Sequence, residues 1–222
     1  MPRLTFWVAS AFVFCGGIAH AGPLVIDFEN LQSADALIHS LGPVYTSNGF
    51  TFTAFAPGGG SDNDPNFNTA GTLSTTFYGS TALFNGNGNG LTRLTRMDGG
   101  LFNLLSLDLV EVPNFESGGW PPMDLGSFTL TFFGTRADGS TVQSTASIDA
   151  FPSVTTHKFA DFQDLVSVEW KQGQGGFTTG LQTHQFDNVR VNAVPEPSTL
   201  LLLSAGLMLY RKRLSNQNRP TP

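Results

Sequence analysis

The segment SFTLTFFGTRADGSTVQSTASI, residues 127–148, decides the fold class of this 222-residue chain. Phe128, Leu130 and Phe132 alternate with polar residues, which is the period-two pattern of a half-buried β-strand. A second alternating run ends at Ile148, and the residues Arg136-Ala137-Asp138-Gly139 separate the two runs. A strand, a turn and a strand in this order predict an antiparallel hairpin whose buried face carries the three apolar residues.

Other short runs along the chain resemble the two halves of this hairpin, and hardly any stretch shows helical periodicity. They are 24–29, 49–55, 81–84, 91–97, 101–110, 165–170 and 184–191. About eight to ten strands of this kind predict an all-β fold, an antiparallel β-sandwich. Within it we expect two strand faces, one formed by Leu105, Leu107 and Leu109 and one formed by Val166, Val168 and Trp170. The segment 33–41 is expected to form a short helical turn or a loop, and the repeated Asn-Gly of 85–90 a turn.

The charge of the central region excludes one class of partner. Between positions 22 and 193 there are six basic and sixteen acidic residues, so this region carries a net charge near −10. Such a surface repels nucleic acid phosphates, and it is compatible with cations such as Ca²⁺ and with neutral sugars. Cys15 is the only cysteine and lies near the N-terminus, so the central region has no disulfide, thiolate metal site or cysteine nucleophile.

The first 21 residues have the organisation of a secretory signal peptide. Arg3 supplies the positive charge, 4–14 form a short apolar region, and Ala19-His20-Ala21 is a small-x-small cleavage site. We predict cleavage after Ala21, which leaves one domain of ordinary size at 22–193.

The last 29 residues, 194–222, form a tail that combines three features. Pro195-Glu196-Pro197 cannot lie inside a helix and is predicted to be extended. The apolar segment 198–210 is predicted to form a short hydrophobic helix, a marginal transmembrane span that is shorter than the roughly 20 residues a bilayer core requires. Arg211, Lys212 and Arg213 then form a basic end that suits the cytoplasmic side of the membrane.

This tail, with Val194 through Thr199 followed by the leucine-rich run and the basic end, resembles the PEP-CTERM sorting signal of Gram-negative bacteria. The resemblance implies export across the inner membrane, transient anchoring there, and recognition of Pro195, Glu196 and Pro197 by an exosortase-like processing enzyme. It also implies delivery to the cell surface or the extracellular matrix and a link to exopolysaccharide. The alternative is an ordinary C-terminal anchor or an amphipathic tail.

The first and last predicted strands resemble, more weakly, those of jelly-roll domains of the carbohydrate-binding-module type. Such strands often pair, and the resemblance implies a structural calcium ion at that edge. Asp187 shares strand parity with Val189 and Val191, and a buried carboxylate requires a partner or a cation. With Asp27 and Glu29 on the neighbouring strand, the three carboxylates could bind Ca²⁺. Alternatively, Asp27 and Glu29 are solvated and Asp187 accepts a backbone hydrogen bond.

Two loops are candidate binding sites. Trp120 follows two glycines and precedes two prolines, so its ring could stack on a sugar, although a Trp that caps the sandwich is the simpler interpretation. Tyr45 and Tyr78 are weaker candidates of the same kind. Asp62, Asp64 and Asn66 imitate the start of an EF-hand loop, but Phe67 replaces the required glycine.

The sequence therefore predicts an exported protein of the cell envelope or exopolysaccharide that has a structural or adhesive role and no catalytic one. One alternative is a carbohydrate-binding module with a defined glycan ligand, and another is an enzyme that acts on polysaccharide. No metalloprotease or hydrolase motif is present, and the histidines are scattered.

Overall fold

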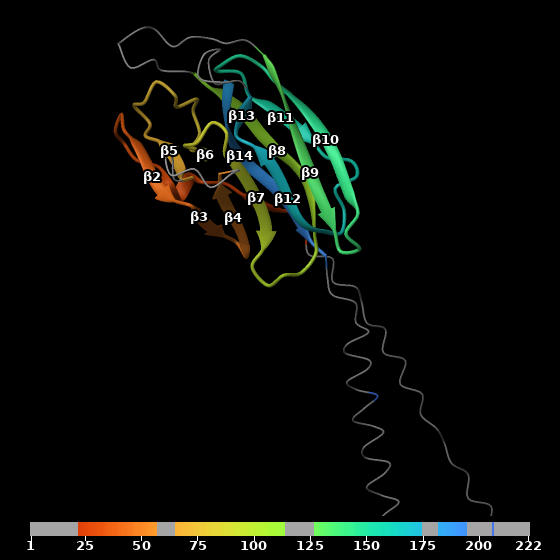
Figure 1. Ribbon diagram of the computed structural model, residues 1–222. Helices are drawn as coiled ribbons and strands as arrows, with labels where there is room; N and C mark the ends of the chain where they lie inside the picture. The colour runs from red at the N-terminus through yellow and green to blue at the C-terminus, as the bar shows by residue number, and fades with distance from the viewer. Residues whose placement is uncertain (1–21, 57–64, 114–126, 175–181, 195–205, 207–222) are drawn as a thin grey trace, which may run out of the picture. The chain divides into compact units, whose positions relative to one another are not determined.

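The computed structural model describes residues 22–56, 65–113, 127–174, 182–194 and 206. The predicted signal peptide with Ala19 and Ala21, Trp120, and the tail with its Pro195–Pro197 motif and Arg211–Arg213 basic end lie outside these residues. Of the predicted C-terminal helix only Gly206 is described, and its backbone is helical. Residues Ala21–Val194 form one unit, shown in Figure 1.

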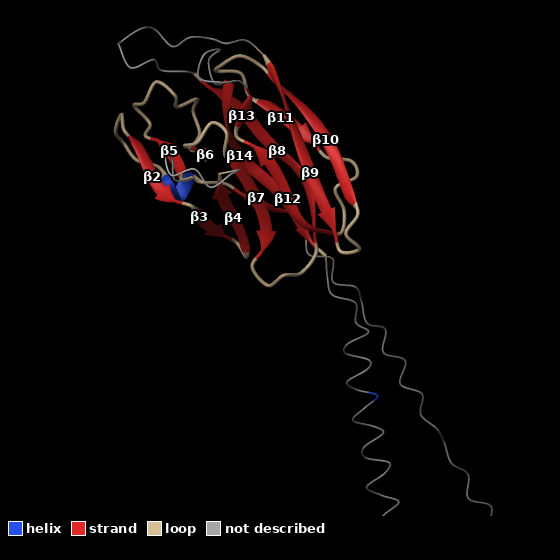
Figure 2. Ribbon diagram, in the orientation of Figure 1, coloured by secondary structure: helices blue, strands red, loops and turns tan. Residues whose placement is uncertain are grey.

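Strands account for nearly all the regular structure of this unit, as Figure 2 shows. They are β1 (Leu24–Ile26), β2 (Ile38–Gly42), β3 (Val44–Ser47), β4 (Phe50–Phe55), β5 (Phe67–Ala70), β6 (Phe84–Asn85), β7 (Leu91–Arg96), β8 (Phe102–Val112), β9 (Phe128–Arg136), β10 (Thr141–Ile148), β11 (Thr155–Lys158), β12 (Leu165–Lys171), β13 (Gly173–Gln174) and β14 (Gln182–Ala193). A single turn of 3-10 helix, η1, spans Glu29–Leu31. All pairings between these strands are antiparallel, which confirms the all-β prediction.

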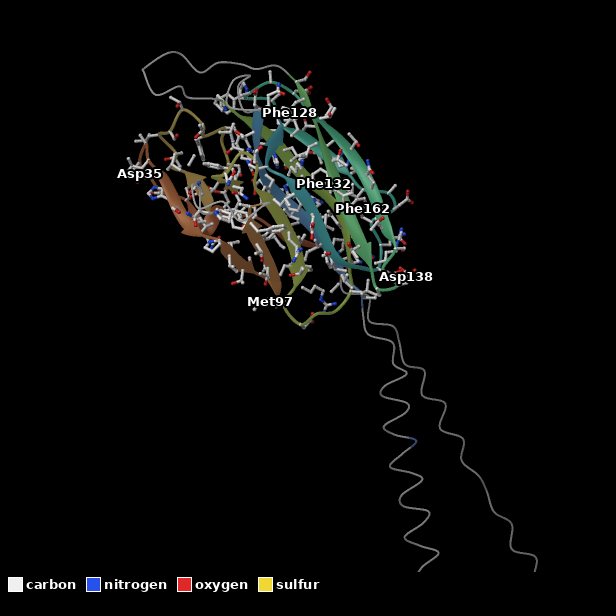
Figure 3. The ribbon with its side chains drawn as sticks, in the orientation of Figure 1. Asp35, Met97, Phe128, Phe132, Asp138 and Phe162 are labelled. Atoms are coloured by element: carbon white, nitrogen blue, oxygen red, sulfur yellow. The ribbon has the colours of Figure 1, made fainter. Side chains whose placement is uncertain are left out.

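The predicted hairpin is β9–β10, and its register runs without interruption from Thr135 opposite Thr141 to Phe128 opposite Ile148. Gly139 closes the turn at φ 82°, a left-handed conformation that costs glycine little. The Asp138 carboxylate accepts a hydrogen bond from the Ser140 backbone N–H at 2.9 Å, which stabilises the turn. Asp138 is labelled at this turn in Figure 3.

The eleven-stranded sheet folds back on itself to form two layers. One layer has the order β3-β4-β7-β12-β9-β10. The other has the order β1-β14-β8-β11, and the short β13 also pairs with β14 in it. Only the pair Leu165–Phe102 joins β12 to β8, so the layers can separate and face each other. Where β10 and β11 lie at the margins of the two layers, the Ser144 hydroxyl and His157 Nε2 are 2.8 Å apart and link them.

Aromatic rings fill the space between the layers. Trp170 of β12 and Phe52 of β4 lie 5.1 Å and 5.7 Å, centroid to centroid, from Phe186 of β14. Phe132 of β9 contributes to the same core, and all four rings are fully buried. Phe128, Leu130 and Phe132 form the buried face of the hairpin, as predicted. Figure 3 shows Phe132 and Phe162 within the body of the domain.

Three details of the sequence prediction were wrong. Leu105 and Val166 are only partly buried, because the register shifts next to each of them and Leu104 and Leu165 take the core positions. The segment 33–41 was expected to be a helical turn or a loop, but its C-terminal part enters β2 and pairs with β5. A β-bulge changes the parity of every residue beyond it, so strict alternation fails there.

The first and last strands are neighbours, as expected. Leu24 and Ile26 of β1 lie opposite Val191 and Val189 of β14. The two ends of the domain therefore meet on one pair of strands, and the residues that precede the tail belong to the sheet.

Candidate functional site

A network of carboxyl and hydroxyl groups lies on the outer side of β14. The Ser80 hydroxyl oxygen is 2.6 Å from Glu29 Oε1 and 2.6 Å from Asp187 Oδ2. The Tyr78 hydroxyl donates to the same oxygen of Asp187 at 3.0 Å. Segment 72–83 thus lies over β14 and is held there by side chains distant in sequence.

One hydroxyl bridges two carboxyl groups at this point. The Ser80 hydroxyl has a single hydrogen to donate, yet it lies within hydrogen-bond distance of both Glu29 and Asp187. It can donate fully to only one of them at a time, so the two contacts are satisfied together only when one carboxyl group carries a proton.

The pKa values of the two carboxyl groups shift in opposite directions. Burial raises the pKa of Asp187, and the hydrogen bonds that it accepts only partly offset that effect. At Glu29, burial opposes ionisation, but hydrogen bonds from Ser80 and Thr81 outweigh it and lower the pKa. Burial and the neighbouring Asp187 raise the pKa of Tyr78, which keeps the hydroxyl protonated and able to donate.

The network continues across the sheet to β8. Asn188 adopts φ 49° at the bulge in β14, and its Nδ2 donates to Asp108 Oδ2 at 3.0 Å. The Thr156 hydroxyl donates to the other Asp108 oxygen at 2.6 Å. We call this side of β14 and β8, with Asp187 beneath segment 72–83 and Asp108 linked to it through Asn188, the covered face.

Asp187 is fully buried, as its strand parity suggested, but for another reason. Phe186 is the residue that faces the core, and the bulge at Asn188 then restores Val189 and Val191 to the core side. Asp187 lies on the opposite side, where segment 72–83 covers it. Nothing in the sequence marked Ser80 as the residue that would join Glu29 to Asp187.

The structure brings together two of the three predicted calcium ligands. Glu29 and Asp187 meet at Ser80, whereas Asp27 is exposed in the short segment between β1 and η1. Within the described residues no three acidic, histidine or cysteine side chains are grouped so as to hold a metal ion. The predicted trio is not assembled there, and calcium binding stays a prediction.

The three histidines that follow the predicted signal peptide lie apart. His39 is 2.9 Å from Asp35, and His157 contacts Ser144. His184 is fully buried, and burial lowers its pKa to about 4, so its ring is neutral at physiological pH. Neither of the tyrosines considered for sugar stacking is free, because Tyr78 binds Asp187 and Tyr45 packs against Phe28 and donates to Asn30.

The end of the domain is held by an arginine. The Val194 backbone N–H donates to the Leu101 carbonyl at 2.9 Å, and Arg96 Nη1 donates to the Val194 carbonyl at 3.2 Å and to the Leu101 carbonyl at 2.8 Å. The Asp98 carboxylate pairs with the same guanidinium. Residues near both ends of the domain, Gly22 and Ala193, line a cavity of about 290 Å³ beside it. The chain is therefore fixed up to the residue before Pro195.

Residues 193–213 match the PEP-CTERM protein-sorting motif. The chain carries a PEP-CTERM sorting signal. Such a signal implies an exported protein that an exosortase-type system sorts to the cell surface of a Gram-negative bacterium. The match begins at Ala193, the last residue of β14, so the matched segment overlaps the end of the folded domain.

Other comparisons add little. A solved structure of an exo-beta-agarase aligns with 80% of this chain at 12% identity and a TM-score of 0.31, and the chain spans 25% of that protein's length. A likeness of that size supports no argument about activity. Comparison with curated proteins found no match. In the described part of the chain, no helix has the length and apolar character needed to cross a bilayer.

Proposed function

We propose that this PEP-CTERM protein is a non-catalytic structural or adhesive component of the cell envelope, retained in extracellular polysaccharide. The observation that carries the proposal is the junction at Ala193, where the sorting motif begins at the last residue of the last strand. The sorted cargo is thus the sandwich itself, with its final residue Val194 fixed by Leu101 and Arg96.

The arrangement of the termini supports a role as a tethered scaffold. The strand that follows the signal peptide pairs with the strand that precedes the tail, so both chain ends leave from one part of the domain. The extended aromatic core joins all the principal strands into one body. A domain attached at one place leaves its remaining surface available to the matrix.

The proposal is tested by fractionating cells that express the full chain or a chain lacking 195–222. We expect the full chain in the envelope and matrix fractions, and the truncated chain in the periplasm or the medium. A point variant, Glu196→Ala, should accumulate in its unprocessed form, whereas Arg219→Ala, beyond the basic end, should behave as wild type. Identical fractionation of all four proteins would exclude the sorting role.

The absence of catalysis is tested separately. The purified chain is incubated with exopolysaccharide from the producing cells, and new reducing ends are measured against a heat-denatured control. We expect no increase. Release of oligosaccharides would replace this proposal with that of a polysaccharide-active enzyme.

A further inference from the structure

A row of side chains lies on the outer side of the layer β3-β4-β7-β12-β9-β10. It has no part in the sorting role proposed above. Adjacent pairings place Thr53 of β4 beside Arg93 of β7, Arg93 beside Glu169 of β12, Glu169 beside Phe133 of β9, and Phe133 beside Gln143 of β10. At about 4.8 Å between neighbouring strands, the row spans about 19 Å. We call the outer side of these five strands the bare face.

An aromatic ring stands near one end of the row. Phe132 points into the core, so its neighbour Phe133 points outward, and 48% of Phe133 is exposed. Single exposed apolar residues are common on protein surfaces, but this ring lies in line with the hydrogen-bonding side chains of the row. Its flat face matches the apolar C–H face of a sugar ring, whose polar groups remain at the rim.

The centre of the row is polar but electrically neutral. Arg93 Nε and Glu169 Oε1 are 2.6 Å apart, and 47% and 32% of these side chains are exposed. The Arg93 guanidinium also lies over the Phe55 ring, 4.9 Å from its centre, in a cation–π contact that helps to position it. A guanidinium carries five N–H donors and a carboxylate two acceptor oxygens, so the pair can bind neighbouring hydroxyl groups of one ligand.

Hydroxyl side chains flank the row on both sides. Thr51 pairs with Thr95, and Thr131 pairs with Thr145, in register with the row. Ser167, Thr135 and Thr141 continue the pattern over three strands. Each hydroxyl both donates and accepts, which suits a ligand made of hydroxyl groups.

We propose that the bare face binds a neutral polysaccharide chain that lies across β4, β7, β12, β9 and β10. Phe133 stacks on a sugar ring, and Arg93 and Glu169 hydrogen-bond its hydroxyls. Acidic polymers are disfavoured because the domain carries sixteen acidic against six basic residues, and Arg93 is already paired. This inference rests on the proposed matrix role and names the surface that would perform it.

The test is native electrophoresis of the full chain, in mild detergent, through gels that contain hydroxyethylcellulose, dextran or galactomannan, with alginate as an anionic polymer. We expect at least one neutral polymer to retard the wild type and alginate not to. Phe133→Ala should weaken the binding roughly tenfold. Met97→Ala, an exposed apolar residue at the β7–β8 turn, is the matched control and should bind as wild type.

A second variant makes the test independent of Phe133. Arg93→Gln with Glu169→Gln keeps the row neutral and the side-chain lengths similar but removes the ion pair, and it should also bind more weakly. Retardation by none of the neutral polymers, equal retardation by alginate, or unchanged binding of both variants would overturn the inference. Dimers in sedimentation that Phe133→Ala abolishes, without glycan binding, would instead assign the face to contact between copies.

The outcomes separate this inference from the proposed function. If wild-type chains stay in the matrix fraction but bind no neutral polymer, the proposed binding by the bare face is wrong and the proposed matrix role still stands. Chains that bind neutral polymer in gels but fractionate without regard to the tail would remove the sorting role and leave the binding surface.

Discussion

The two layers of the sandwich differ in what lies on their outer sides. On β14 and β8, the covered face places Asp187 beneath segment 72–83 with Asp108 nearby, and hydroxyl and amide groups donate hydrogen bonds to both carboxyl groups. On the other layer, the bare face presents hydroxyls, one ion pair and Phe133 directly to solvent. The same antiparallel geometry thus serves one layer for internal cohesion and leaves the other available for contact.

This difference shows that burial, and not residue type, decides what a carboxylate does on a strand. Asp187 has no exposed surface and shares its oxygens among Tyr78, Ser80 and Asn188. Glu169 has one cation beside it and water around it. When a buried acceptor is removed, its hydrogen-bond donors are left without partners inside the protein, which is costly. When an exposed acceptor is removed, water takes its place as the partner of the donors.

The largest expected difference between the two faces comes from Asp187→Ala. We expect it to lower the free energy of unfolding by about 2–3 kcal/mol, because Tyr78, Ser80 and Asn188 lose an acceptor inside the protein. Glu169→Ala, the matched carboxylate on the bare face, should cost less than about 1 kcal/mol. Urea unfolding of both variants measures the comparison, and equal losses would contradict the distinction between the faces.

The two arginines of β7 sharpen the same contrast. Arg96→Ala should cost about 1–2 kcal/mol, because it removes the donor to the Leu101 and Val194 carbonyls. Arg93→Ala on the bare face should cost less than about 1 kcal/mol. Hydrogen exchange at the Val194 amide should accelerate only in the Arg96 variant. Unchanged exchange there would show that Arg96 does not hold the end of β14.

The pH dependence of the covered face follows from the raised pKa of Asp187. A group whose pKa is higher in the folded state stabilises the fold below its unfolded value, 3.8, and loses that contribution as pH rises through the folded value. Asp187→Asn keeps a hydrogen-bond donor at every pH. Its melting temperature relative to wild type should therefore increase from about pH 4 to about pH 8.

The pKa of Glu29 shifts in the opposite direction from that of Asp187, so Glu29 provides a control. Its lowered pKa stabilises the fold above its unfolded value of 4.5, and that contribution is lost as pH falls. Glu29→Gln should be less stable than wild type at neutral pH and approach it in acid. If the Asp187→Asn difference is constant across the pH range, the pKa of Asp187 is not raised in the folded protein.

The smallest effect is expected at Phe133. Phe133→Ala should change the free energy of unfolding by about 1 kcal/mol or less, because half of its ring already contacts water. Phe132→Ala, one residue earlier in the core, should cost about 3–5 kcal/mol. Thermal unfolding distinguishes them. A large loss at Phe133 would mean that its ring supports the fold and is not kept for binding.

Much of the architecture was accessible from the sequence because alternation is a local property. The hairpin at 127–148, the pairing of the first and last strands and the outward side of Phe133 all follow from counting residues along a strand. Local counting failed at Leu105 and Val166, where bulges change the parity. Local counting also predicted correctly that Asp187 is buried, but it placed Asp187 on the core side of the sheet, whereas the side chain lies on the outer side.

By itself, the sequence determined the fold class and the destination, since strand periodicity and the sorting motif are both read along the chain. Only the tertiary structure decided that Ser80 would stand between Glu29 and Asp187, that Arg96 would hold Val194, and that four adjacent strands would align Arg93, Glu169, Phe133 and Gln143. The reason is physical: these contacts join residues tens of positions apart, and the register of strand pairing depends on the whole core.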